Sequence, residues 1–153
     1  MSSICHRIEE LDTSLLVDKK VVFTNGCFDI LHIGHTTYLT EARQLGDLLV
    51  VGLNSDASVV RLKGIHRPIQ TWEDRAGVLA ALASVDLVIG FDEDTPIRLI
   101  QKIRPDVITK GGDYKESDMI GGDLVKEYGG EIVILPYIPG RSSSELAKRL
   151  SSF

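Results

Sequence analysis

The sequence predicts an α/β protein built on a doubly wound, Rossmann-like parallel sheet of five strands. Short and almost continuous apolar runs alternate along the chain with amphipathic segments, which is typical of strands and helices in turn. The runs contain few polar side chains, as expected for strands that helices cover on both faces. With 153 residues the chain is long enough for one core, so we expect a single domain over residues 1–153.

The five apolar runs that we interpret as strands are separated by segments with helical spacing. The strands are expected at residues 20–23, 48–53, 86–91, 106–109 and 132–135. Helices are expected at residues 36–45, 56–60, 71–82, 95–104, 123–128 and 142–150. Thr71 and Ser142 are good N-cap residues, and Pro96 and Pro105 suit the start and end of one helix.

The N-terminal residues 1–19 are predicted to form a helical extension. Apolar side chains recur there at a helix-like spacing, at Ile4, Ile8, Leu11 and Leu15. Such a segment could pack on the edge of the domain or on a partner subunit. We expect the protein to be a homo-oligomer, most simply a dimer.

Composition and charge exclude several classes of function. The formal net charge is −5 and the pI is about 5.3, so neither nucleic acid nor an anionic membrane is an expected partner. Two cysteines, Cys5 and Cys27, are too few for a disulfide framework. No apolar signal core or membrane-spanning length is present, and the early acidic residues argue against a transit peptide. We therefore expect a cytoplasmic protein. Any phosphate site in it must be built from a few neighbouring residues, because the net charge of the chain is negative.

The most unusual residues lie between the first expected strand and the first expected helix, in the stretch from Thr24 to His35. A glycine-containing turn at this point can direct backbone N–H groups and a helix N-terminus at an anion. His32 and His35 flank Gly34 where the helix should begin, and imidazole N–H groups can donate to phosphate oxygens. Metal binding by the two histidines is the alternative, but no third ligand accompanies them at suitable spacing. The pattern favours a phosphate site without a protein-bound metal.

Two further groups of residues follow the fourth and fifth expected strands, at the edge where such sheets bind ligands. Lys110, Gly111 and Gly112 could be a simple exit from a strand, or a place where backbone approaches a ligand closely. The sequence Arg141-Ser142-Ser143-Ser144 could merely cap the last helix, or could hold a phosphate through hydroxyl, N–H and guanidinium groups.

Residues 61–70 are predicted to be a mobile basic loop. The loop carries Arg61, Lys63, His66 and Arg67, with Gly64 and Pro68 as turn residues. Such a loop could be ordinary solvated surface or could bring a cation to a bound phosphate. Cys27 is expected to be a small packed residue, because no base stands beside it to activate a thiolate.

These motifs together resemble the cytidylyltransferase-like nucleotidyltransferase superfamily. The resemblance rests on Gly26-Cys27-Phe28-Asp29, on His32-Ile33-Gly34-His35 and on the serine run that begins at Ser142. Within the superfamily, the phrases Arg61-Leu62-Lys63-Gly64 and Lys110-Gly111-Gly112-Asp113-Tyr114 look like the adenylyltransferase domain of the bacterial D-glycero-D-manno-heptose 1-phosphate enzymes. The resemblance covers roughly residues 20–150 and implies the nucleotidyltransferase fold that carries a His-x-Gly-His motif.

The resemblance implies transfer of AMP from ATP to a heptose 1-phosphate, with Mg²⁺ bound to the nucleotide phosphates. It implies catalytic roles for His32, His35 and Lys63, and substrate contacts for Asp29 and Arg75, although Asp29 could also orient the turn or serve the metal. The residues implied to bind nucleotide are Gly26, Cys27, Phe28, Gly34, Lys110, Gly111, Gly112, Arg141, Ser142, Ser143 and Ser144.

Two other functions stay open on the sequence. One is a cytidylyltransferase that acts on glycerol 3-phosphate or a similar alcohol phosphate, and the other is a nucleotide-binding regulatory module without catalysis. Relatives of the heptose branch often join the domain to a sugar kinase, which these 153 residues do not contain. Arg141 and three serines also stand where relatives often carry threonines, so the choice of base is weakly specified.

Overall fold

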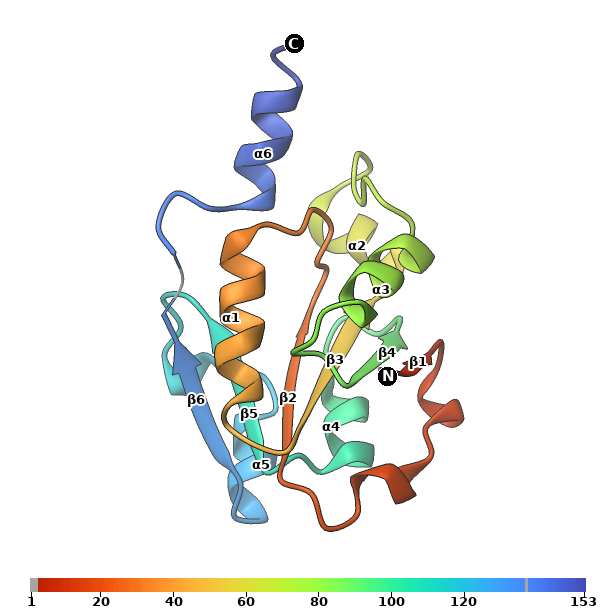
Figure 1. Cartoon of the computed structure of the whole chain (residues 1–153), viewed down its shortest axis with the longest axis vertical. Helices are drawn as coiled ribbons and strands as arrows, with labels where there is room; N and C mark the ends of the chain where they lie inside the picture. Colours follow the sequence, from red (N-terminus) through yellow and green to blue (C-terminus); the bar gives the residue numbers. More distant parts are fainter. Residues whose placement is uncertain (1–2, 137) are drawn as a thin grey trace.

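The computed structural model of the chain describes residues 3–136 and 138–153. Within them, six parallel strands form one sheet in the order β1-β4-β3-β2-β5-β6 (Figure 1). The strands are β1 (Ser3–Cys5), β2 (Val21–Gly26), β3 (Leu48–Asn54), β4 (Leu87–Phe91), β5 (Val107–Gly111) and β6 (Glu131–Leu135). The predicted fold class and all five predicted strands are confirmed, and β1 is a sixth strand that the sequence does not predict.

The N-terminal segment is not the helical extension predicted for residues 1–19. Ser3–Cys5 pairs in parallel with β4 at the edge of the sheet. Two short 3-10 helices follow, at Ile8–Glu10 and Thr13–Leu16. The buried apolar side chains of this segment pack under the sheet, so their spacing reflects short turns and not an α-helix. Residues 1 and 2 lie outside the described part of the chain.

Helices cover both faces of the sheet, as the apolar strands require. One face is packed by α1 (Ile33–Arg43) and α3 (Trp72–Ala80). The other face is packed by α4 (Ile97–Ile103), α5 (Gly122–Glu127) and the N-terminal 3-10 segment. The remaining helices, α2 (Asp56–Lys63) and α6 (Ser143–Leu150), lie toward the carboxyl ends of the strands (Figure 1). None of the helices in the described ranges has the length and apolarity to cross a bilayer.

The predicted caps at Thr71 and Ser142 are confirmed, whereas α1 begins at Ile33, before the predicted start at residue 36, and α4 begins after Pro96. The hydroxyls of Ser55, Thr71 and Ser142 accept hydrogen bonds from backbone N–H groups at 3.0–3.3 Å and so begin α2, α3 and α6. The predicted basic loop is shorter than residues 61–70, because α2 continues through Lys63 and ends at Gly64, which has a φ of 97°. Lys63 is therefore held on a helix.

The central strand β2 marks the topological switch point of the sheet. It pairs with β3 on one side and with β5 on the other, and the chain progresses in opposite directions from it. Ligands bind beyond the carboxyl ends of strands at such points. The turn from Thr24 to His35 leaves the sheet here, so the topology places it where a ligand is expected.

Candidate active site

The two histidines form the N-terminal cap of α1. His32 is the N-cap residue, and its Nδ1 accepts a hydrogen bond from the backbone N–H of Gly34 at 3.1 Å. The Nδ1 of His35 accepts from the backbone N–H of His32 at 3.3 Å, and the two ring centroids are 3.9 Å apart. Because both Nδ1 atoms are acceptors, a neutral ring must carry its proton on Nε2. Each imidazole therefore keeps an Nε2–H donor for a ligand.

Gly34 is required by the packing of the histidine rings. A Cβ atom at this position would lie 2.8 Å from Cε1 of His32 and 3.4 Å from Cβ of Arg141. A larger residue would push the His32 ring out of its cap. The same geometry shows that Arg141, which precedes α6, lies beside the turn.

Burial and neighbouring cations keep the histidines neutral. Burial, followed by the charges of His32 and Lys63, lowers the pKa of His35 from 6.5 to about 4. Burial and the nearby Arg141 also lower the pKa of His32. Both rings are therefore neutral hydrogen-bond donors near pH 7, and the positive charge at the site comes from lysine and arginine.

This arrangement predicts a specific titration of His35. An NMR titration should show the Nε2–H tautomer and a pKa near 4, and addition of ATP should raise that pKa because phosphate charge offsets the repulsion by Lys63. Since the pKa is lowered on folding, the contribution of His35 to stability is complete above pH 6.5 and is lost as the pH falls toward 4. A pKa of 6.5 or above in the unliganded protein would contradict this electrostatic picture.

A cavity of about 320 Å³ lies at the carboxyl ends of β2 and β5 and contains much of the predicted site. The predicted residues that line it are Gly26, Cys27, Phe28, Asp29, Gly34, His35, Lys63, Lys110, Gly111 and Ser143. The lining also includes residues that the sequence analysis does not assign to the site: Thr24, Asn25, Tyr38, Arg67 and Tyr114. Residues from four separate segments of the chain therefore meet in one cavity.

The inner wall of the cavity is formed by Tyr38 and Gly111. The Tyr38 hydroxyl lies 2.7 Å from Oγ1 of Thr24, and burial raises its pKa to about 12. Tyr38 therefore stays protonated and acts as a fixed polar wall. A Cβ at Gly111 would lie 3.0 Å from the Tyr38 ring, so this glycine is needed for packing. The signal for Tyr38 in the sequence is only its place on the apolar face of the helix, which does not mark a site residue.

The serine run divides between structure and site. Ser142 caps α6, and the Ser143 hydroxyl donates to the carbonyl of Ile30 at 2.9 Å, which ties the start of α6 to the histidine turn. Only Ser143 of the run lines the cavity, while Ser144 is exposed. Gly112 has a φ of 110° and donates its N–H to Leu135 at 3.0 Å, so it shapes the exit from β5.

Asp29 holds protein donors in this structure, and its predicted contact with substrate stays a prediction. Its carboxylate is 1% exposed and accepts from Nε of Arg67 at 2.6 Å and from the backbone N–H groups of Ile69 and Gln70 at 2.9 Å. Burial alone would raise the pKa of this carboxyl, but these donors lower it below its ordinary value. Asp29 anchors the loop between α2 and α3 beside the cavity.

Arg75 also has partners within the protein and not in a substrate. It is 1% exposed, and its guanidinium donates to the carbonyls of Cys27 at 2.7 Å, Asn54 at 2.9 Å and Gln70 at 3.2 Å. It also pairs with Asp56 at 2.6 Å. Arg75 therefore joins the turn after β2 to the end of β3 and the start of α2, while its predicted contact with substrate phosphate stays a prediction.

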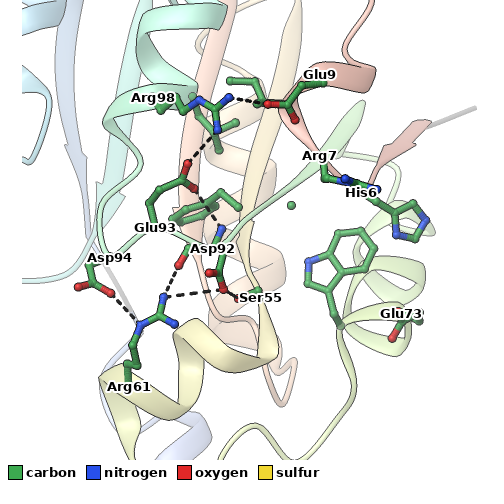
Figure 2. A pocket seen from close by; sticks show the side chains of 15 residues that line it. His6, Arg7, Glu9, Ser55, Arg61, Glu73, Asp92, Glu93, Asp94 and Arg98 are labelled. Carbon is green, nitrogen blue, oxygen red and sulfur yellow. Dashed lines mark hydrogen bonds and ion pairs between the residues drawn. The ribbon is translucent and has the colours of Figure 1, made fainter.

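A larger cavity, of about 730 Å³, lies beyond β4 and beside the N-terminal segment. Figure 2 shows that two of its arginines pair with acidic side chains: Arg61 with Asp92 and Asp94, and Arg98 with Glu9 and Glu93. Its lining contains none of the residues predicted to bind nucleotide. Its charges are largely satisfied within the protein, so the smaller cavity is the better candidate for anionic substrates.

The side chains of the described residues do not supply a ready metal site. No group of three or more His, Cys, Asp or Glu residues that could hold a metal ion is found within residues 3–136 and 138–153. Asp29, the carboxylate in the lining of the cavity, already accepts from three protein donors. A metal here would have to be held mainly by oxygens of the substrate.

Phosphate is the ligand that the histidine turn suits best, and the doubly wound parallel sheet places this turn where ligands bind. The family model described as cytidylyltransferase-like matches residues 23–137. The chain belongs to this family.

Curated relatives align with most of the length of this chain. The bifunctional protein HldE of Magnetococcus marinus is 56% identical over 134 residues, which are 88% of this chain and 28% of that protein. HldE of Campylobacter concisus is 57% identical over 145 residues, 94% of this chain and 30% of that protein. The chain thus spans less than a third of the length of these curated relatives.

Solved structures confirm the fold. The lipopolysaccharide core biosynthesis protein of Thermoplasma volcanium is 31% identical, with a TM-score of 0.64 over 78% of this chain and 97% of that chain. Pantothenate synthetase of Thermus thermophilus has a TM-score of 0.63 over 88% of this chain and 62% of that chain. At 17% identity the second likeness concerns the fold alone.

Proposed function

We propose that the chain transfers AMP from ATP to D-glycero-D-manno-heptose 1-phosphate, which gives ADP-heptose and pyrophosphate for lipopolysaccharide or another surface glycan. The observation that carries the chemistry is the pair of imidazoles that cap α1 beside a cavity lined by Lys63 and Lys110. The choice of substrate is supported by identity above one half to the HldE relatives and by the likeness to a lipopolysaccharide core biosynthesis protein.

The reaction needs positioning and charge stabilisation more than proton transfer. A phosphate oxygen of the sugar attacks the α-phosphorus of ATP, and the bond from that phosphorus to pyrophosphate breaks. The attacking phosphate is already an anion near neutral pH, so no general base is required. The Nε2–H groups of His32 and His35 would donate to phosphate oxygens on which negative charge grows in the transition state.

The nucleotide is proposed to lie over the ends of β2 and β5. Backbone at Gly26, Cys27 and Phe28 would cradle it on one side, with Lys110 and the backbone of Gly111 on the other. Burial lowers the pKa of Lys110 and the nearby charge of Lys63 lowers it further, while negative charge on Cys27 would oppose that shift; a bound phosphate would likewise favour the charged lysine. Arg141, Ser142, Ser143 and Ser144 would face the β- and γ-phosphates.

Mg²⁺ is proposed to enter with ATP. The phosphate oxygens would supply most of its ligands, because the lining of the cavity offers no uncommitted carboxylate. Bound there, the ion supplies positive charge to the phosphates and the leaving pyrophosphate. A cytoplasmic location and a homodimeric state belong to the same proposal.

One assay tests this function against its alternatives. Pyrophosphate release is measured with ATP, CTP or GTP, each with heptose 1-phosphate or glycerol 3-phosphate as acceptor. We expect turnover with ATP and heptose 1-phosphate at least tenfold above any other pair. Turnover with CTP and glycerol 3-phosphate would identify the alternative cytidylyltransferase. Nucleotide binding without turnover on any pair would favour a regulatory module.

A further inference from the structure

Arg67 has an unused hydrogen-bonding group beside the candidate active site. The residue lies in the loop between α2 and α3, lines the same cavity as His35 and Lys63, and has a side chain that is 12% exposed. Its Nε donates to Asp29 at 2.6 Å, which fixes the plane of the guanidinium. Its Nη2 is buried and has no hydrogen-bond partner in the described part of the chain.

Three other arginines in the described part of the chain have more hydrogen-bond or ion-pair partners. Arg75, whose side chain is fully buried, donates through Nε, Nη1 and Nη2 to four protein oxygens. Arg61 and Arg98 each bridge two acidic residues at the second cavity (Figure 2). A buried donor left without an acceptor costs about 1–3 kcal/mol, and more when it is charged. The exception at Arg67 therefore indicates that its acceptor arrives with a ligand.

The position of Arg67 indicates which ligand. The proposed nucleotide contacts at Lys110 and Gly111 come from the end of β5, on one side of β2. Arg67 and Lys63 come from the segment that follows β3, on the opposite side of β2. In an in-line displacement the attacking group and the leaving pyrophosphate lie on opposite sides of the α-phosphorus. The proposed function assigns the β5 side to the nucleotide and the start of α6 to the leaving pyrophosphate, so the segment that follows β3, where Arg67 lies, is the part of the cavity left for the attacking group.

We propose that Arg67 binds the phosphate group of the acceptor substrate, and that Asp29 is the positioning residue that aims its guanidinium. Two parallel N–H donors of a guanidinium match two oxygens of a phosphate. The buried Asp29 holds Arg67 through Nε and leaves the terminal nitrogens to the ligand. This inference rests on the proposed nucleotidyl transfer and adds to it the residue that selects a phosphorylated acceptor.

The test is to measure the KM values of both substrates for Arg67→Lys. This variant keeps the positive charge but loses the planar guanidinium with its parallel N–H donors. We expect the KM for heptose 1-phosphate to rise at least tenfold, with the KM for ATP changed less than twofold. Arg98→Lys is the matched control, since Arg98 pairs with Glu9 and Glu93 away from this cavity, and it should leave both constants unchanged. Asp29→Asn should shift the acceptor KM in the same direction, because the amide holds Nε more weakly.

Two results would overturn the inference while leaving the proposed function intact: a raised KM for ATP alone, or no change in either KM. If the wild-type protein turns over no heptose 1-phosphate, the proposed function fails. The inference about Arg67 is then tested separately by calorimetry, which measures the binding of ATP and of mannose 1-phosphate. Weaker binding of mannose 1-phosphate to Arg67→Lys, with ATP binding retained, supports it. Equal binding to both proteins, or no binding of the sugar phosphate to the wild type, overturns it.

Discussion

Replacing His35 by alanine should lower kcat by about 100- to 1000-fold while changing the affinity for ATP by less than about threefold. The reason is that its Nε2–H donor should interact most strongly with phosphate oxygens in the transition state, where negative charge has grown. Steady-state kinetics of pyrophosphate release, combined with calorimetric binding of ATP, measure the two effects separately. A rise in KM with an unchanged kcat would show that His35 binds substrate without a special role in the transition state.

The structural role of His35 calls for a second variant. Its Nδ1 accepts from the backbone of His32, so alanine also removes part of the cap of α1. His35→Gln restores an acceptor at the third helical position, as in a capping box. We expect His35→Gln to regain most of the Tm lost in His35→Ala and to stay at least tenfold below the wild type in kcat. Recovery of both quantities together would assign the defect to the cap.

Replacing Arg75 by methionine should lower the free energy of unfolding by about 2–4 kcal/mol, because buried backbone carbonyls lose their donor. Methionine has a similar length but no donor, so it would leave Asp56 unpaired and the carbonyls of Cys27 and Asn54 without their shared partner. Urea denaturation measures the loss. Arg98→Met is the matched control, because that side chain is 60% exposed and its ion pairs should contribute less than about 1 kcal/mol. Equal losses in the two variants would contradict the role of Arg75.

The regular elements were predictable because each depends on local sequence. Strands such as Leu48–Asn54 are continuous apolar runs, and Thr71 and Ser142 are strong N-caps whose side chains act within three residues. The strand Ser3–Cys5 was not predictable from its residues. Three residues have no measurable periodicity, and the strand exists because β4 offers it a free edge.

The candidate site was predictable where a motif is contiguous and unpredictable where its partners are distant. The histidine turn and Lys110 are visible as motifs in the sequence. Asp29 and Arg75 are of residue types that often bind substrates. Only the fold shows that Asp29 accepts a hydrogen bond from a backbone N–H 40 positions away, and that Arg75 donates to a carbonyl 48 positions away. For Arg67 the sequence shows only a basic residue in a loop. Only the fold shows that its Nη2 is buried and unpaired.

The pairing of β2 has a consequence for the order in which the chain folds. Val22 meets Leu49 of β3 across a separation of 27 residues, whereas Val22 and Phe23 meet Val107 and Ile108 of β5 across a separation of 85 residues. Closing the longer loop costs more entropy and depends on slower, non-local contacts. The half of the sheet containing β2 and β3 is thus expected to form early, and the wall that carries Lys110 late. A refolding chain would regain much of its helix and strand content before it can bind a nucleotide.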